Sequence, residues 1–255
     1  MRIVSAGHAI FAATFIAIGM LGLITGHLAP IWEPVPRYVP AREALAYLFA
    51  LISLVSGLGL LWRRAAAPAA RALLAYLLVG FLLFKARDIY LAPLMEGSYE
   101  DCGETVVLIA GAGVLYAWLA SQWDKQHLGF MTGYHGVRIA RVLYALALIA
   151  FGLAHFIYLQ QTVVLVPGWL PAHVAWAYLT GGTYIAAGAA LLLGLYAPLA
   201  AALSALQMGA FTLLVWLPIV ARGADASQWA EFVTSWALTA GGWVVADSYR
   251  ARLLA

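Results

Sequence analysis

The feature that most limits what this chain can fold into is a series of eight long apolar stretches, separated by short polar segments. A helix that crosses the hydrocarbon core of a bilayer needs about 20 mostly apolar residues, and each stretch is close to that length. Only 10% of the 255 residues are charged, too few to cover the surface of a soluble protein of this length. We therefore predict an all-α, polytopic integral membrane protein. The predicted spans are Ala9–Leu28, Ala44–Trp62, Ala70–Tyr90, Thr105–Trp123, Ile139–Leu159, Val174–Leu195, Pro198–Ala221 and Gln228–Ala246.

Composition also excludes several classes of protein. A disordered chain is excluded because 65% of the residues are apolar. The formal charge of +3 is small and scattered, so nucleic acid is not an expected partner. Cys102 is the single cysteine and there is no CxxC motif, which argues against thiol–disulfide chemistry.

Charged residues between the predicted spans sort by sign. With eight spans both chain ends lie on one side, which carries nine basic and two acidic residues. The other side carries five basic and nine acidic residues. Because cytoplasmic loops are rich in Lys and Arg, we expect a multi-pass protein of the inner (plasma) membrane. Its N- and C-termini would lie in the cytoplasm and its acidic side outside.

The two halves of the chain resemble each other. VPRYVP at residues 35–40 is followed by AREALAYL, and VPGWLP at residues 166–171 is followed by AHVAWAYL. The offset from Val35 to Val166 holds through both motifs, and we call it the repeat spacing. Gly57 and Gly188 keep that spacing, and Gly19 matches Gly152 after a shift of two positions. We predict two parallel four-helix repeats, residues 1–123 and 139–255, joined by a basic cytoplasmic linker at residues 124–138.

Each proline-rich motif interrupts the helical pattern, because the residue before a proline avoids the helical conformation. We expect an extended connection at the outer surface, with Tyr38 or Trp169 at the level of the lipid headgroups, where aromatic residues act as anchors. Alternatively, the connection covers a site between the helices, and Trp169 then contacts a ligand.

The second half shows a further series of motifs: FGLAHF at 151–156, VPGWLP at 166–171, YLTGGTYIAAG at 178–188 and AGGWVVAD at 240–247. This order resembles the DoxX-like superfamily of four-helix integral membrane proteins, and the first half resembles it through the repeat. The resemblance implies a quinone-linked redox component or membrane subunit. Many relatives carry a Glu four residues before the second-helix glycine, where this chain has Tyr184 and Ser53. A carboxylate mechanism at that position is therefore not expected.

Polar side chains within a bilayer are costly, so each one in a predicted span is a candidate for function. In the second half, His155 and Glu231 are the candidate catalytic groups, which would exchange protons with a quinone near the outer ends of their helices. The candidate substrate contacts of this half are His173, Gln207, Tyr184 and Trp169. A structural alternative is that His155 bonds a backbone carbonyl and that Glu231 favours a helix N-terminus.

The first half contains a second candidate substrate site. Lys85, Arg87 and Asp88 end the third predicted span, and Glu104 lies at the start of the fourth. Asp88 would pair with Arg87 or Lys85 and leave the other cation to bind an anionic group. The alternative is an interfacial ion pair with no ligand. The preceding acidic segment, residues 96–101, is expected to be a solvated loop.

Three functions remain open from the sequence. The first is a quinone-linked redox component acting with a redox partner protein. The second is a carrier or binding protein for a small lipophilic or anionic solute, although no predicted helix has the Pro or Gly break typical of alternating access. The third is a non-catalytic assembly subunit.

Quinone is the one cofactor that the resemblance suggests. Haem and metal are not expected, since there is no HxxxH, HExxH or Cys–His cluster. Membrane lipid is a partner under each of the three functions, and a homo-oligomer is compatible with all of them.

Overall fold

The computed structural model describes residues 3–33, 35 and 39–250, and every regular element in those ranges is a helix. Seven of the described helices are long and apolar enough to cross a membrane. This confirms the prediction of an all-α, polytopic membrane protein. The seven are α1 (Ala6–Thr25), α2 (Arg42–Leu61), the run α3–η2–α4 (Ala66–Leu91), α5 (Glu96–Leu119), α7 (Gly133–Ile157), α9 (His173–Leu193) and the run α10–η4–α11 (Ala197–Ala221).

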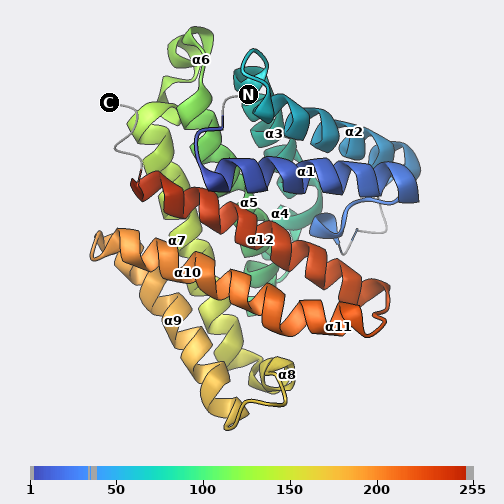
Figure 1. The fold of residues 1–255 in the computed structure, drawn as a ribbon, viewed down its shortest axis with the longest axis vertical. Helices are drawn as coiled ribbons and strands as arrows, with labels where there is room; N and C mark the ends of the chain where they lie inside the picture. Colours follow the sequence, from blue (N-terminus) through green and yellow to red (C-terminus); the bar gives the residue numbers. More distant parts are fainter. Residues whose placement is uncertain (1–2, 34, 36–38, 251–255) are drawn as a thin grey trace.

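The eighth predicted span is a helix but differs from the others. α12 (Ala226–Arg250) is long enough to cross a membrane, yet it carries too many polar residues to count with the seven. In Figure 1, α12 runs across the middle of the molecule between α1 and α10, and it also packs against α5. The second half of α12, from Ala240 to Ser248, is mostly buried among these helices, whereas its first turns are exposed.

The long helices form a closed ring in chain order. Each one packs against the next, from α1 through α2, α3, α5, α7, α9 and α10 to α12, and α12 packs back against α1. α5 and α12 also pack against each other across the ring. The start of α1 therefore adjoins the end of α12, where the Gly7 amide donates to Asp247 Oδ2 at 2.8 Å. The short elements η1 (Pro30–Trp32), α6 (Gln122–His127), η3 (Gly129–Met131) and α8 (Leu159–Leu165) lie between the long ones.

Unusual backbone features recur at the repeat spacing. α2 and α9 each follow an alanine in the left-handed conformation, Ala41 with φ 49° and Ala172 with φ 55°. The third helix of each half contains a π-helical turn, η2 at Phe81–Lys85 and η4 at Thr212–Trp216. Both pairs keep the offset that separates Val35 from Val166. Strained alanines and π turns are uncommon, so their matched positions are what a duplication would leave.

Glycine brings the first two helices of each half into backbone contact. A Cβ on Gly19 would lie 2.5 Å from the Leu54 amide nitrogen of α2, and one on Gly152 would lie 2.7 Å from the Gly181 carbonyl oxygen of α9. No larger residue fits at either crossing, which agrees with the pairing of these two glycines in the sequence.

The acidic segment before the fourth span differs from its prediction as a solvated loop. α5 begins at Glu96, well before the predicted start at Thr105, so Glu100 and Asp101 lie within a helix. The solvated-loop prediction is therefore wrong. Asp101, whose side chain is 25% exposed, forms an ion pair with the buried Lys85.

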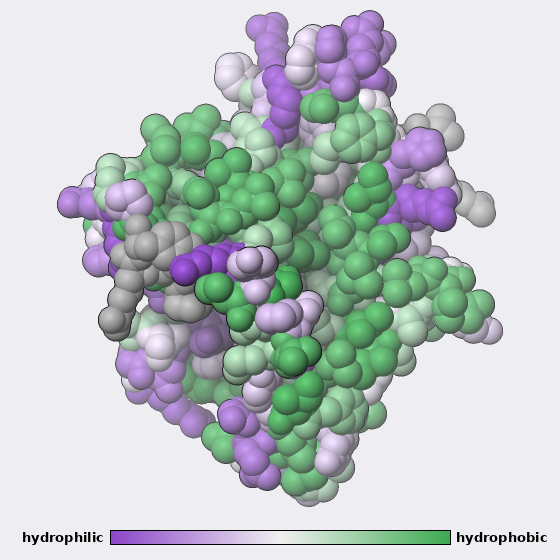
Figure 2. Space-filling view, turned by 180° about the vertical axis from the view of Figure 1, so that it is seen from behind, coloured by the Kyte–Doolittle hydropathy of each residue, from purple (hydrophilic) through white to green (hydrophobic). Residues whose placement is uncertain are grey.

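The second proline-rich connection is non-helical between α8 and α9, as expected, and Trp169 is 70% exposed. The corresponding prediction at Tyr38 falls outside the described residues. Apolar side chains cover most of the face shown in Figure 2, with hydrophilic residues gathered at its upper end and lower left. Such a surface suits contact with membrane lipid.

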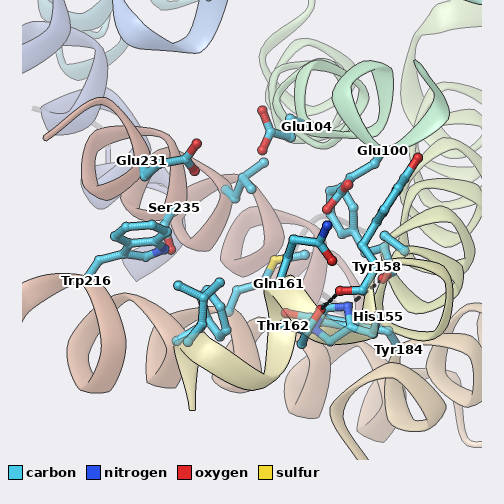
Figure 3. A pocket seen from close by; sticks show the side chains of 16 residues that line it. Glu100, Glu104, His155, Tyr158, Gln161, Thr162, Tyr184, Trp216, Glu231 and Ser235 are labelled. Atoms are coloured by element: carbon cyan, nitrogen blue, oxygen red, sulfur yellow. Dashed lines mark hydrogen bonds between the residues drawn. The ribbon is translucent and has the colours of Figure 1, made fainter. Parts of the chain in front are cut away.

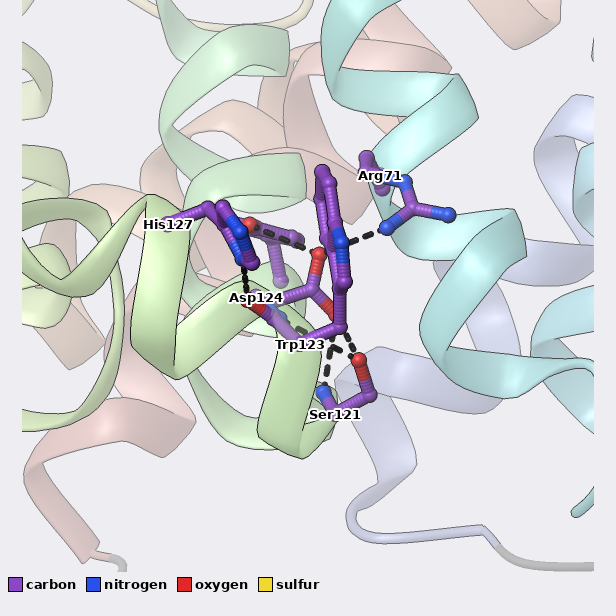
Figure 4. A network of polar contacts seen from close by, with 6 residues as sticks. Arg71, Ser121, Trp123, Asp124 and His127 are labelled. Carbon is purple, nitrogen blue, oxygen red and sulfur yellow. Dashed lines mark hydrogen bonds and ion pairs between the residues drawn. The ribbon is translucent and has the colours of Figure 1, made fainter.

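The buried carboxylate of Asp124 connects the linker between the halves to α3 and α5 by hydrogen bonds (Figure 4). Asp124, in α6, accepts hydrogen bonds from the Ser121 amide at 2.8 Å, from Tyr116 at 3.0 Å and from Arg71 at 2.9 Å. Burial alone would raise the pKa of Asp124. The hydrogen bonds from Ser121, Tyr116 and Arg71 outweigh that effect and hold the pKa below its ordinary value.

Candidate functional site

A cavity of about 340 Å³ lies within the second half of the chain. Its walls come from α7, α8, α9, α10, η4 and α12, and the first turns of α5 complete its rim (Figure 3). Most of the wall is aromatic or apolar, and the principal contributors are Phe151, Tyr184, Met208, Phe211 and Trp216. Large apolar cavities with a few polar groups are the usual form of a small-molecule site.

His155 contributes an imidazole to this cavity from the last turns of α7. Its Nδ1 lies 2.7 Å from the Phe151 carbonyl oxygen, which can only accept a hydrogen bond. The Nδ1 atom is therefore the protonated one in the neutral ring, and Nε2 carries the free lone pair. No described residue hydrogen-bonds Nε2. The structural alternative given from the sequence is thus right for one nitrogen and leaves the other available.

Tyr184 and Gln207 form a polar pair beside the histidine. The Tyr184 ring lies edge-on to His155 at 5.7 Å between centroids, and its hydroxyl hydrogen-bonds Gln207. Gln207 in turn accepts from Thr183 at 2.7 Å and donates to the Thr180 carbonyl at 3.0 Å. Gln207 is not part of the cavity wall, but it positions Tyr184, which is a wall residue.

Three carboxyl groups form the boundary between this cavity and a second one. Glu100, Glu104 and Glu231 line the aromatic cavity and also a polar vestibule of about 400 Å³ beside it. Glu33 and Asp101 add two further acidic residues to the vestibule. Glu100 on α5 and Glu231 on α12 are separated by the repeat spacing, so the repeat places equivalent carboxyl groups on both central helices.

Lys85 is the basic residue that lies beside these carboxyl groups. The π turn η2 directs its side chain into the bundle, where the residue is 0% exposed. The ammonium group donates to Asp101 and to the Glu33 backbone carbonyl, so Lys85 is not the partner of Asp88, which was one of the two pairings considered from the sequence. A paired, buried lysine balances part of the acidic charge but offers little to an anionic ligand.

The remaining sequence candidates lie away from the cavity. His173 lines a separate surface hollow with Leu170 and Tyr178, and Trp169 is exposed beyond it. Arg87 is exposed and Asp88 is half-buried, and neither borders the cavity or the vestibule.

The structure thus brings together His155, Tyr184, Glu104 and Glu231, with Gln207 and Lys85 directly behind them.

Sequence reasoning missed several residues of the site. The aromatic wall residues were hidden within apolar spans, where nothing distinguishes a cavity wall from a lipid-facing surface. Glu100 had a usable signal, because it matches Glu231 at the repeat spacing. Tyr158, which lines the cavity and accepts a hydrogen bond from the Gly97 amide at 3.0 Å, had none.

In the first half, a side chain of the protein itself fills the corresponding interior. Trp32 is fully buried and packs edge-on against Phe49 and Tyr76, with centroids 5.7 and 5.4 Å away. The indole lies directly over Gly80, where any Cβ would collide with it. The residue that matches Gly80 at the repeat spacing is Phe211, a wall of the open cavity.

Comparison with models of protein families, with curated proteins and with solved structures gave no match. Within residues 3–33, 35 and 39–250, no group of three or more His, Cys, Asp or Glu side chains is arranged to hold a metal ion.

Proposed function

We propose that the protein is a quinone-linked membrane component that binds the ring of a lipophilic carrier next to His155. The carboxyl groups at the cavity rim exchange the protons of that ring with the vestibule. One observation carries this proposal: an imidazole with a free ring nitrogen lies in an aromatic-walled cavity that is also lined by three carboxyl groups.

The shape and chemistry of the cavity suit such a ring. Phe151, Tyr184, Phe211 and Trp216 offer faces and edges on which a planar ring can stack, and aromatic contacts of this kind favour edge-to-face or offset geometry. Polar side chains from α5, α7, α8 and α12 interrupt the apolar wall and can fix the orientation of a bound ring.

Proton exchange follows from the polar residues of the cavity. A neutral imidazole can take a proton from a hydroxyl group at its free ring nitrogen and return it, which is the usual role of histidine in general acid–base chemistry. Glu100, Glu104 and Glu231 border both chambers, so they can relay protons to the vestibule. We place the vestibule on the outer side of the inner membrane, with both termini in the cytoplasm, as the charge distribution predicts. The electrons pass to or from a redox partner protein.

Intrinsic tryptophan fluorescence tests the proposal, because Trp216 forms part of the cavity wall. Purified protein titrated with short-chain ubiquinone or menaquinone analogues should show saturable quenching. His155→Ala and Glu231→Gln should each weaken binding at least about tenfold, the loss expected for one well-placed polar contact. His173→Ala is the matched control, because His173 lies outside the cavity. Quenching that His155→Ala and Glu231→Gln both leave unchanged would refute the site.

A carrier for a lipophilic solute is the second candidate function. Two observations favour it: the cavity and the vestibule share three residues, and α3 and α10 continue into π turns that could let these helices bend. Uptake of a labelled lipophilic solute by proteoliposomes without any redox partner would support the carrier over the redox component. An anionic solute fits poorly, because the vestibule is acidic and Lys85 is already paired.

A further inference from the structure

The charged groups around the aromatic cavity are almost all of one sign. The cavity and the vestibule have in common the carboxyl groups of Glu100, Glu104 and Glu231, which we call the shared carboxyl groups. The vestibule adds the carboxyl groups of Glu33 and Asp101. Among the residues that the structure describes, no lysine or arginine lines either chamber. The charge of the two chambers therefore favours a positively charged ligand and repels an anion.

Lys85 is the basic side chain beside these groups, and it is already engaged. Its ammonium group is buried and donates to Asp101 and to the Glu33 carbonyl. This part of the bundle can thus hold an ammonium group away from water. In the described part of the chain, the shared carboxyl groups form no hydrogen bond or ion pair. They are left without a cation bonded directly to them.

The two halves differ at the position of this lysine. Lys85 ends the π turn η2, and the residue that ends η4 at the repeat spacing is Trp216. Phe232 stands at the same spacing from Asp101, the partner of Lys85. The second half thus keeps a carboxyl group on its central helix but has an aromatic ring where the first half has an ammonium group.

The aromatic side chains of the cavity can bind a cation through their ring faces. Trp216 is joined in the wall by Phe151, Tyr184 and Phe211. The face of an aromatic ring is electron-rich and attracts a nearby cation, and tryptophan does so most strongly. η4, which carries Trp216, packs against α12, which carries Glu231 (Figure 3). Neighbouring elements therefore supply a ring and a carboxyl group to the same cavity.

We propose that the cavity binds a second class of ligand, a lipophilic organic cation such as a hydrophobic quaternary ammonium compound. The positive head lies between the aromatic wall and the shared carboxyl groups, and the apolar body packs along Leu165, Met208 and Leu238. Taking a cation out of water is costly, and the ring faces and carboxylates together offset that cost. The site does not depend on the redox role proposed above, and the cation competes with a quinone ring for the same wall.

Two ligands of one shape isolate the effect of charge. A phenylbutyl trimethylammonium salt and its neutral analogue, with a carbon atom in place of the nitrogen, differ in charge alone. Isothermal titration calorimetry on the purified full chain in an uncharged detergent should show that the cation binds at least about tenfold tighter. Added salt should weaken binding of the cation and leave that of the neutral analogue unchanged, because salt screens partly exposed charges.

Variants of the chain locate the bound cation. Glu104→Gln combined with Glu231→Gln should reduce the preference for the cation toward onefold, because both amides are neutral. Trp216→Leu should reduce the preference in part, because leucine keeps an apolar wall but has no ring face. Glu43→Gln is the matched control and should keep the preference, since Glu43 is exposed in the first turn of α2 and lines neither chamber.

The same titrations with a short-chain quinone separate this inference from the proposed function. Equal affinity for the cation and its neutral analogue would overturn the inference, and saturable quinone binding would then leave the proposed function intact. A preference for the cation without any quinone binding would support the inference and remove the proposed function. A preference that persists in the combined Glu104→Gln and Glu231→Gln variant would also overturn the inference. The two ligands on the unaltered protein decide the question even if a variant fails to fold.

Discussion

Individual buried polar residues in this protein are each stabilised in a different way. Asp124 is fully buried and satisfied by hydrogen bonds, Lys85 is paired with Asp101, and His155 is bonded through one nitrogen only. His155 is half-buried and lines the cavity, where its second ring nitrogen is free to bond a ligand.

Removing the Asp124 carboxylate should destabilise the protein. Asp124→Ala leaves the Tyr116 hydroxyl and the Arg71 guanidinium without their acceptor. We expect the unfolding free energy to fall by about 2–3 kcal/mol. This loss is smaller than that for a fully buried ion pair, because the Arg71 side chain is partly exposed. Thermal unfolding in detergent measures it. Asp225→Asn is the control, because Asp225 lies on the surface and caps only the start of α12.

The same carboxylate predicts a dependence on pH. Since the pKa of Asp124 is lower in the folded protein than its ordinary value, ionisation stabilises the fold fully above about pH 4, the ordinary pKa of Asp. That stabilisation is lost as the pH falls through the folded pKa. The difference in melting temperature between the unaltered protein and Asp124→Asn should therefore shrink below about pH 4. A difference that is constant from neutral pH down to about pH 3 would contradict this assignment.

Trp32 is predicted to be a structural residue of the first half. Trp32→Ala removes a fully buried indole and its hydrogen bond to Tyr76, with an expected cost of about 3–5 kcal/mol. Trp169→Ala, at an exposed indole, should cost less than about 0.5 kcal/mol. Unfolding curves for the two variants measure these losses of unfolding free energy. Equal losses would show that the stability of the first half does not depend on Trp32.

At the scale of helices, the apolar pattern predicted nearly every element but not every boundary. Apolar spans of membrane-crossing length identified seven membrane-crossing helices and also α12. The predicted start of α5 was too late, because its first turns carry acidic side chains that a neighbouring lysine stabilises. The π turn η2 contains no proline or glycine, so nothing in its sequence predicts it, whereas Pro218 just after η4 is a helix-disrupting residue that marks the second turn.

Two adjacent glycines in α9 test how closely the helices approach. A Cβ on Gly181 would lie 2.7 Å from the His155 Cβ and 3.0 Å from the Gly152 carbonyl oxygen, whereas one on Gly182 would meet nothing within 4 Å. Gly181→Ala should therefore cost about 1–3 kcal/mol and weaken ligand binding by displacing His155. Gly182→Ala should be neutral or stabilise by up to about 1 kcal/mol, because alanine favours a helix. Similar melting temperatures for both variants would contradict the packing of α7 against α9.

At the scale of the whole molecule, the sequence identified the polar groups of the site better than its walls. His155, Glu231, Glu104 and Tyr184 were named because polar or motif residues in a span are conspicuous, and the structure groups them. The aromatic wall depends on how α7, α9 and the run α10–η4–α11 converge, which one chain's sequence does not reveal. His173 and Trp169 were named from their motif alone and lie outside.

Topology can be measured with single introduced cysteines, because Cys102 is only 3% exposed and should not react. We expect Gly129→Cys in the linker and Gly168→Cys in the proline-rich connection to react from opposite sides of the membrane when a membrane-impermeant thiol reagent is added. Labelling of both cysteines from the same side would mean that the chain crosses the membrane an even number of times between the linker and that connection. This result would refute the predicted orientation.

The central claim is that the second half holds an open ring-binding cavity while Trp32 closes the first half. Photo-crosslinking with a short-chain azidoquinone, followed by peptide mass spectrometry, tests this most directly. We predict adducts within residues 151–165 and 208–216 that excess unlabelled hydroquinone suppresses, and far weaker labelling of the Trp32, Phe49 and Tyr76 interior. Adducts spread over the lipid-facing helices without competition, or concentrated around Trp32, would contradict it.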